Sequence, residues 1–278
     1  SRVVVAGGME SMSNAPHFVR SVKRGEDVSF SSLESILMND GLNDAFTNEA
    51  MGSTGETVAL EHGITREQAD SFSVRSHTLA NKAWDEGWLE SEVFPVDSLE
   101  RDEGIRPSTT VEILSNLKAV FKENGQVTAG NASQVSDGGS AVLIASEDAA
   151  NDLDLPILAR IVGYSTSGVE SSRVMSAPIP TVEKLLDETG FSIGDVDILE
   201  HNEAFSSASC AIKEAFEFHE ESFNPHGGAV AIGHPLGSTG TRCLMTLVNA
   251  LIRTQGERGI VTMCLGGGNA VAMMIETK

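Results

Sequence analysis

Residues 259–268, Gly-Ile-Val-Thr-Met-Cys-Leu-Gly-Gly-Gly, form a short apolar run that ends in three consecutive glycines. A second apolar run follows at 269–276, so the pattern predicts two strands joined by a glycine turn. Directly before them, residues 241–254 carry apolar side chains at helical spacing along one face. This order of helix, strand and strand predicts part of a layered α/β fold.

The same alternation extends back through the second half of the chain and predicts helices packed on a central sheet. The expected elements are a strand at 157–164, a helix at 181–189, a strand at 196–201, a helix at 205–217 and a glycine-rich loop at 226–240.

The first half has fewer strands. Residues 2–6 are a β-branched run that we expect to form a buried strand, and 141–144 is a second strand. Between them the pattern predicts helices and irregular loops, with an exposed loop at 98–112. Thr65 and Gln68 have the spacing of a capping box, which predicts the start of the longest helix.

Length and composition limit the classes of protein to which this chain of 278 residues can belong. With 40% hydrophobic residues it can bury a core for two domains, or for one large domain with an insertion. The net charge of −21 disfavours nucleic acid or an anionic membrane as partner. The three cysteines lack the paired spacing of a disulfide framework or zinc site, so we expect no metal and a cytoplasmic location.

Three polar residues stand at expected turns. His234 lies in Gly-Gly-Ala-Val-Ala-Ile-Gly-His-Pro-Leu-Gly (227–237), Cys264 lies before the triple glycine, and Asn202 follows a strand. Glycine allows close backbone approach and leaves N–H groups free to bind an oxyanion. Each residue alone also suits a turn histidine or a buried cysteine. Their combination indicates acyl-thioester chemistry.

Five stretches of the sequence resemble, in the same order, motifs of the thiolase family, which includes acetyl-CoA acetyltransferases and 3-ketoacyl-CoA thiolases. They are Val-Ala-Gly-Gly-Met-Glu-Ser-Met-Ser (5–13), Thr-Ala-Gly-Asn-Ala-Ser (128–133), Asn-Glu-Ala-Phe (202–205), Gly-His-Pro-Leu-Gly (233–237) and Cys-Leu-Gly-Gly-Gly (264–268).

The resemblance implies a layered α/β/α/β/α fold whose first half is truncated here. We expect residues 1–10 and 137–155 to be the remnant of the N-terminal domain, 11–136 an inserted, mainly helical loop domain over the coenzyme A site, and 156–278 the C-terminal domain. In the family, the cysteine that carries the acyl group precedes the motif at 5–13, and it is not in this sequence. We therefore expect this chain alone to be inactive.

The resemblance also assigns catalytic roles. His234 would activate the nucleophilic cysteine, and Asn202 would position a water beside it. Cys264 would be the acid/base that removes a proton next to the thioester carbonyl, and we expect nearby dipoles to lower its pKa. The N–H of Gly266 would belong to an oxyanion hole.

Residues for substrate binding follow in the same way. Ser133 matches a serine that contacts the pantetheine arm, Ala129 lies in the same motif, and Met51 and Phe205 match residues near the acyl pocket. Local capping and ordinary core packing would explain the same residues. Ala50 stands where short-chain thiolases often have histidine, which suggests room for a longer or branched acyl chain. Coenzyme A thioesters would be the substrates, with no cofactor.

Coenzyme A is anionic and needs a local basic patch. Its candidates are Lys118 and Lys122, with Arg101 and Arg106 nearby, although scattered surface charges would look the same. The segment 20–32 aligns with the tetramerisation loop of many thiolases, so a homo-oligomer, dimer or tetramer, is expected.

Three functions therefore remain open. The first is acyl transfer, condensing two acetyl-CoA molecules or thiolysing 3-ketoacyl-CoA. The second is a noncatalytic subunit that binds coenzyme A, or an inactive fragment. The third is a thioesterase in which Cys264 is the nucleophile and His234 its base.

Overall fold

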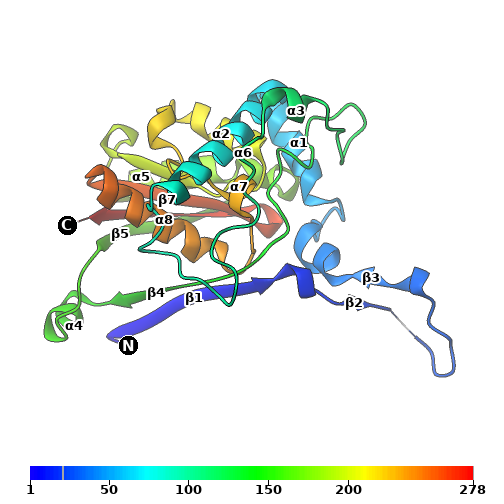
Figure 1. Ribbon diagram of the computed structural model, residues 1–278, viewed down its shortest axis with the longest axis horizontal. Helices are drawn as coiled ribbons and strands as arrows, with labels where there is room; N and C mark the ends of the chain where they lie inside the picture. The colour runs from blue at the N-terminus through cyan, green and yellow to red at the C-terminus, as the bar shows by residue number, and fades with distance from the viewer. Residues whose placement is uncertain (21, 278) are drawn as a thin grey trace.

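A four-stranded sheet forms the centre of the computed structural model, which describes residues 1–20 and 22–277 (Figure 1). Its strand order is β5-β8-β7-β6, in which β6 and β7 are parallel and the other neighbours antiparallel. The predicted pair of strands around the triple glycine is confirmed as β7 and β8. The bounds are β5 Ala159–Gly168, β6 Ile198–His201, β7 Arg258–Leu265 and β8 Asn269–Thr277.

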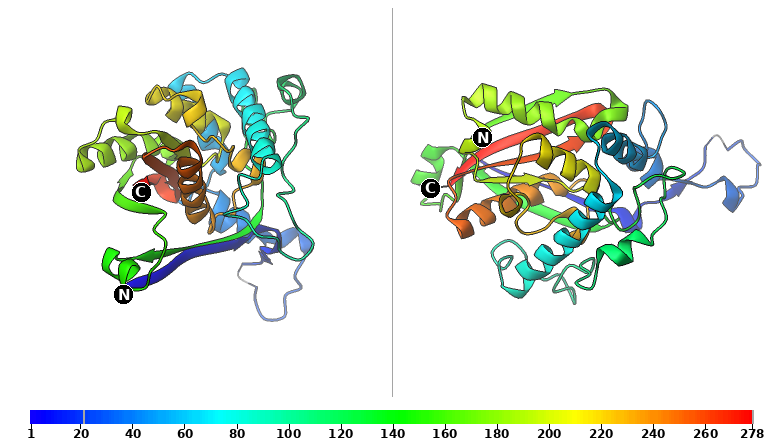
Figure 2. Two further views of the ribbon diagram at one scale, coloured as in Figure 1. Left: turned by 60° about the vertical axis from the view of Figure 1, so that its left-hand side comes forward. Right: turned by 90° about the horizontal axis from the view of Figure 1, so that it is seen from above.

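Helices cover both faces of this sheet. Side chains alternate along a strand, so neighbouring residues face opposite sides. In β7, Ile260 belongs to the core cluster that includes α5 (Pro178–Thr189), whereas Val261 belongs to the cluster with α8 (Thr239–Thr254). The right-hand view of Figure 2 shows the sheet between these two helices. The predicted helices at 181–189 and 241–254 are thereby confirmed.

A second, two-stranded sheet lies beyond α8. Strands β1 (Val3–Ser11) and β4 (Asp137–Ala145) pair antiparallel, with Gly7 opposite Ala141. Figures 1 and 2 show this ribbon passing below α8, which packs between the ribbon and the four-stranded sheet. Helix, sheet, helix and sheet thus follow one another in layers, as predicted.

The prediction that residues 2–6 are buried is wrong. Val5 is 70% exposed and Val4 is 46% exposed, although both lie inside β1. Within the described residues β1 pairs with β4 alone, and α8 packs against one face of the ribbon. The β-branched pattern found the strand but could not tell how many neighbours cover it.

The remaining elements position the site. The predicted capping box begins α2, since Thr65 Oγ1 accepts from Gln68 N and Gln68 Oε1 accepts from Thr65 N. Helix α7 was not predicted, because its four residues lie inside a glycine-rich loop. No helix among the described residues is long and apolar enough to span a membrane. The bounds are α1 Met51–His62, α2 Arg66–Asp85, α3 Val111–Ser115, α4 Glu147–Asp152, α6 Ser206–Ala215, α7 Ala229–Ile232, β2 His17–Phe18 and β3 Glu34–Ser35.

Truncating Leu247 to alanine tests the packing of α8 on the sheet. Leu247 is fully buried, so Leu247→Ala should lower the free energy of unfolding by about 3 kcal/mol. Urea denaturation followed by circular dichroism measures this. Leu60→Ala, at an exposed position of α1, is the control and should change stability by less than about 0.5 kcal/mol. Equal effects of the two variants would contradict this packing.

Candidate active site

Asn202 and His234 form the centre of the site. Asn202 follows β6 directly and is 1% exposed, and its Nδ2 lies 3.2 Å from His234 Nε2. The other ring nitrogen of His234, Nδ1, lies 2.7 Å from the hydroxyl oxygen of Thr239. The structure therefore brings together two of the residues that the sequence motifs single out, 32 positions apart.

Glycines allow the loop of His234 to approach its neighbours. The backbone N–H of His234 donates to Ser136 Oγ at 2.8 Å, and a Cβ on Gly233, whose φ is 93°, would overlap that same hydroxyl. A Cβ on Gly8 would overlap the carbonyl oxygen of Gly237. The glycines in both motifs are thus explained by close backbone contact.

The buried carboxylate of Glu203 holds the same loop from the other side. Glu203 accepts hydrogen bonds from Ser76 Oγ at 2.6 Å, from Asn224 Nδ2 at 2.9 Å and from Val230 N at 3.2 Å. These three donors come from α2, from the loop after α6 and from α7. Glu203 therefore connects the end of β6 to the segment that leads to His234.

A cavity of about 200 Å³ opens beside His234. Its wall includes Met51, Phe205 and Ser133, so four of the predicted site residues meet there. Apolar side chains supply most of the remaining wall, as is usual for small-molecule pockets. They include Met12, Met38, Leu42, Ala50, Phe121 and Leu236.

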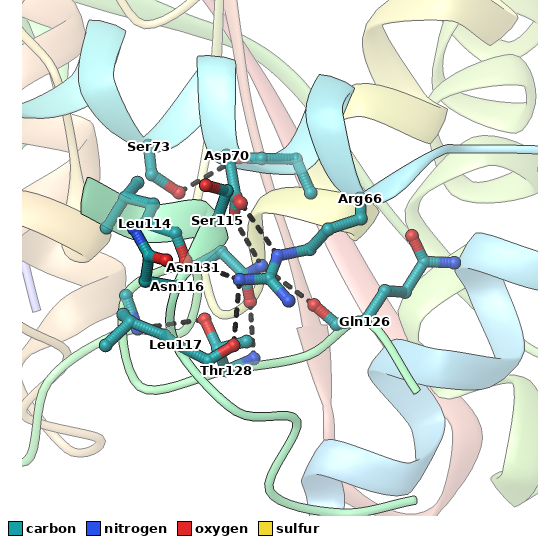
Figure 3. A network of polar contacts seen from close by, with 12 residues as sticks. Arg66, Asp70, Ser73, Leu114, Ser115, Asn116, Leu117, Gln126, Thr128 and Asn131 are labelled. Carbon is teal, nitrogen blue, oxygen red and sulfur yellow. Dashed lines mark hydrogen bonds and ion pairs between the residues drawn. The ribbon is translucent and has the colours of Figure 1, made fainter. Parts of the chain in front are cut away.

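A polar network fixes the loop that carries Ser133 (Figure 3). Arg66 Nε donates to Asp70 at 2.7 Å, and Asn131 Nδ2 donates to the other oxygen of Asp70 at 2.9 Å. Asn131 Oδ1 accepts from Thr128 N at 2.8 Å, which closes the turn before Ser133. The backbone N–H of Ser133 then donates to the carbonyl oxygen of Ala204 at 2.9 Å, beside Asn202.

Cys264 lies at the end of β7, where its sulfur contacts the sulfur of Met175 at 3.6 Å. Burial raises the pKa of the Cys264 thiol to about 11, so the expectation of a lowered pKa is wrong. Desolvation outweighs the local backbone hydrogen bond that favours the thiolate. Cys264 is therefore a neutral thiol at pH 7 in this structure.

The structure does not bring every predicted residue to the cavity wall. Among the described residues that line it, Asn202, Cys264, Gly266 and Ala129 do not appear, although Asn202 contacts His234, which does. Gly266 is exposed at the turn after β7, and Ala129 is exposed in the turn that precedes Ser133.

His234 is held neutral. Burial is the main cause that lowers its pKa to about 4, and the positive charge of Arg242 adds to it. A neutral imidazole has one nitrogen with a proton and one with a free lone pair. At neutral pH, His234 can therefore accept a proton from a neighbouring group.

Sequence reasoning missed part of the cavity wall and the partner of His234. Met12 lies in the motif at 5–13, where it was assigned no role, and Met38 and Leu42 lie in a segment for which no element was predicted. Thr239 could have been found, because it lies two residues before the expected helix 241–254 and follows Pro235 by four residues, a spacing at which a hydroxyl reaches back to the preceding turn. Gln134, which follows Ser133, donates to the carbonyl oxygens of Gly104 and Val230.

Comparison with known proteins agrees with this geometry. Residues 1–148 match the model of the thiolase N-terminal domain, and residues 155–277 match that of the thiolase C-terminal domain. An acetyl-CoA acetyltransferase of Pseudomonas aeruginosa is 38% identical over 99% of this chain and 72% of its own length. A probable acetyl-CoA acetyltransferase of Escherichia coli K12 is 37% identical with the same coverage.

Solved structures give the same result. Human mitochondrial 3-ketoacyl-CoA thiolase superposes with a TM-score of 0.94 at 38% identity, over 100% of this chain and 72% of that one. A structure of the human enzyme in complex with CoA superposes with a TM-score of 0.94 at 39% identity, over 100% of this chain and 71% of that one. Fold and site define an acyltransferase of the thiolase type. The chain belongs to the thiolase family, and its thiolase-like fold is confirmed.

Removing Asp70 tests the network of Figure 3. Asp70→Ala leaves the Arg66 guanidinium and the Asn131 amide without their shared acceptor, so the free energy of unfolding should fall by about 3 kcal/mol. Urea denaturation measures this. The control is Asp85→Ala, because Asp85 lies on the same helix as Asp70 but forms only an exposed ion pair with Arg101. It should lower the free energy of unfolding by less than about 1 kcal/mol. A loss no larger than that of the control would contradict the network's role.

Acid should destabilise the chain through its buried histidines. Burial lowers the pKa of His201 to about 3 and those of His77, His226 and His234 to about 4, below the ordinary value of 6.5. Between the lowered pKa values and 6.5, the unfolded chain binds more protons than the folded chain. The stability that the neutral rings contribute is therefore fully present above about pH 6.5 and is lost as the pH falls below it. Three carboxyl groups whose pKa values burial raises oppose the trend, namely Glu200, Glu92 and Asp102.

We expect each of the four histidines to remove about 1 kcal/mol or more of stability between about pH 7 and pH 5. Urea denaturation at the two pH values measures the sum. An unfolding free energy that stays constant or rises at the lower pH would show that these rings are not neutral in the folded chain.

Proposed function

We propose that this chain supplies the acid/base half of a thiolase-type acyltransferase, which condenses two acetyl-CoA molecules or thiolyses a 3-ketoacyl-CoA. The acyl group would be carried by a cysteine outside these 278 residues. The observation that carries the proposal is the contact of Asn202 with His234, which lines an apolar cavity together with Ser133 and Met51. Its relatives are acetyl-CoA acetyltransferases and thiolases, which supports this class.

His234 would take the proton of the nucleophilic thiol. Its neutral ring provides the required lone pair at Nε2, where Asn202 Nδ2 is the only described side chain within hydrogen-bond distance. A thiolate is the attacking form of cysteine, and an imidazolium beside it stabilises its charge. This accounts for a histidine at the wall of the cavity.

Asn202 and His234 would then stabilise the thioester oxygen. Once His234 Nε2 carries the proton, it and Asn202 Nδ2 are both donors, and they can no longer bond to each other. An acceptor between them, either the developing oxyanion or a water, satisfies both. Donors placed in this way are worth about 3 kcal/mol each in related sites.

Cys264 would act as the acid/base at the carbon next to the thioester carbonyl. Its neutral thiol is the form that protonates a carbanion leaving during thiolysis. Condensation needs the thiolate, so the thiol must first lose its proton. Substrate binding that brings polar groups near the sulfur would lower its pKa for this step.

Coenzyme A would enter along the loop of Ser133. Phe121 lines the cavity, and Lys118 and Lys122 stand on either side of it in the sequence. Both lysines are exposed, and their ammonium groups suit an anionic carrier. A solved relative, the human mitochondrial thiolase, is described in complex with CoA. Ala50 at the cavity wall, with Met38 and Leu42, supports an acyl chain longer than acetyl.

A homo-oligomer completes the proposal. Residues 17–20 and 22–35 project from the body as an arm (Figure 1), and Phe30 on this arm is 92% exposed. An aromatic ring at such a position suits burial against another copy of the chain.

The thioesterase alternative has less support. The ring nitrogens of His234 face Asn202 and Thr239, and Cys264 contacts Met175 instead. A nucleophilic cysteine needs a lowered pKa, whereas burial raises that of Cys264.

The proposed half reaction can be measured without the nucleophile, as exchange of the acetyl-CoA methyl hydrogens with deuterated water. We expect exchange above the solvent rate, lowered by about 100-fold or more in Cys264→Ala because the base is removed. Cys210→Ala, in the buried face of α6, is the control and should keep the rate. NMR of the methyl signal follows the reaction, and calorimetry measures CoA binding.

The alternatives give different results. Binding of CoA without exchange would support the noncatalytic subunit, and hydrolysis that needs no free CoA would support the thioesterase. Exchange that persists in Cys264→Ala would overturn the assigned acid/base. Thiolysis of acetoacetyl-CoA should appear only when a polypeptide with the nucleophilic cysteine is added.

A further inference from the structure

The hydroxyl of Thr239 is buried between a ring nitrogen of His234 and the carbonyl oxygen of Pro235. Thr239 is 1% exposed, and its Oγ1 lies 2.7 Å from His234 Nδ1 and 2.8 Å from the carbonyl oxygen of Pro235. A hydroxyl has one hydrogen to donate. It can therefore donate to only one of these atoms, and the other contact must have a different donor.

The helix geometry favours donation to the carbonyl. Thr239 is the first residue of α8, and its hydroxyl reaches the carbonyl four residues earlier, a bond that threonine commonly makes. Thr254 at the other end of α8 makes the same bond to Ala250 at 2.8 Å. With its hydrogen used in this way, Thr239 offers His234 only a lone pair.

We propose that Thr239 is a positioning residue that fixes the tautomer of His234, so that Nδ1 carries the proton and Nε2 keeps the lone pair. This rests on the proposed function, in which Nε2 takes and returns the proton of the nucleophile. Asn202 Nδ2 donates to the same lone pair at 3.2 Å, which agrees with this tautomer.

The same arrangement serves both charge states of the ring. In the neutral ring, Nδ1–H donates to Thr239, and in the imidazolium it still does. Proton transfer at Nε2 therefore needs no rotation of the imidazole or of the hydroxyl. A threonine that donated to Nδ1 would instead have to turn when the ring becomes charged.

Hydrogen bonds of the two residues before Thr239 hold the start of α8 in place. The preceding residue, Ser238, bonds to Ser140 of β4 through its hydroxyl at 3.0 Å, and Ser140 Oγ donates to the Ser238 carbonyl oxygen at 2.7 Å. Gly237 N donates to Glu10 of β1 at 3.3 Å. The start of α8 is thus fixed to the β1–β4 ribbon, and the hydroxyl has little freedom to leave the ring.

Nitrogen NMR of the histidine rings tests this on the chain itself, without any turnover. We expect the His234 ring, assigned as the signal absent from His234→Gln, to show one tautomer, protonated at Nδ1, at neutral pH. In Thr239→Val, which keeps the shape but not the hydroxyl, the ratio of the tautomers should shift about tenfold toward Nε2–H. Thr239→Ser should restore the wild-type spectrum.

Thr254→Val is the matched control, because it removes the same type of helix bond far from His234, and it should leave the ring signals unchanged. A wild-type ring protonated at Nε2 overturns the proposal, as does a Thr239→Val ring that keeps the wild-type tautomer. If Thr239→Val fails to fold, the wild-type and Thr239→Ser spectra decide. A correct tautomer without methyl exchange of acetyl-CoA would count against the proposed function alone.

Discussion

The carboxylate of Glu203 is the interaction on which the site depends. It lies at the end of the short strand β6, next to Asn202, and has no exposure to solvent. A buried carboxylate is costly unless donors surround it, and here they come from α2, α7 and the loop after α6. Satisfying this one group draws the segments on both sides of the site together. The distance between Asn202 and His234 is a consequence of that constraint.

The elements of the C-terminal half could be predicted because their signals are local. Apolar residues at helical spacing marked α8, and the apolar runs before and after the triple glycine marked β7 and β8. The strand-end rule placed Asn202, whereas its joint role with His234 came from the resemblance to thiolase motifs, because His234 lies in a glycine-rich loop. The exposure of β1 could not be predicted, since it depends on which distant segments cover the ribbon.

The protonation states of the site were the least predictable property. The motif around Cys264 suggests a dipole-rich turn, yet the sulfur packs against Met175 and the pKa rises. His234 stands in a glycine-rich loop that suggests exposure, yet burial lowers its pKa. In both cases desolvation is the largest cause of the pKa shift, and it depends on how the whole fold packs around the group, which no short motif contains.

The partner of His234 has a chemical consequence of its own. Catalytic histidines are often oriented by a carboxylate, which also stabilises the imidazolium and raises its pKa. Thr239 orients the ring without a charge, and Arg242 adds a positive field that disfavours the imidazolium. A ring in this setting is a weak base that returns its proton readily. That suits a reaction in which the same nitrogen must activate a thiol and then be neutral again for the next acyl group.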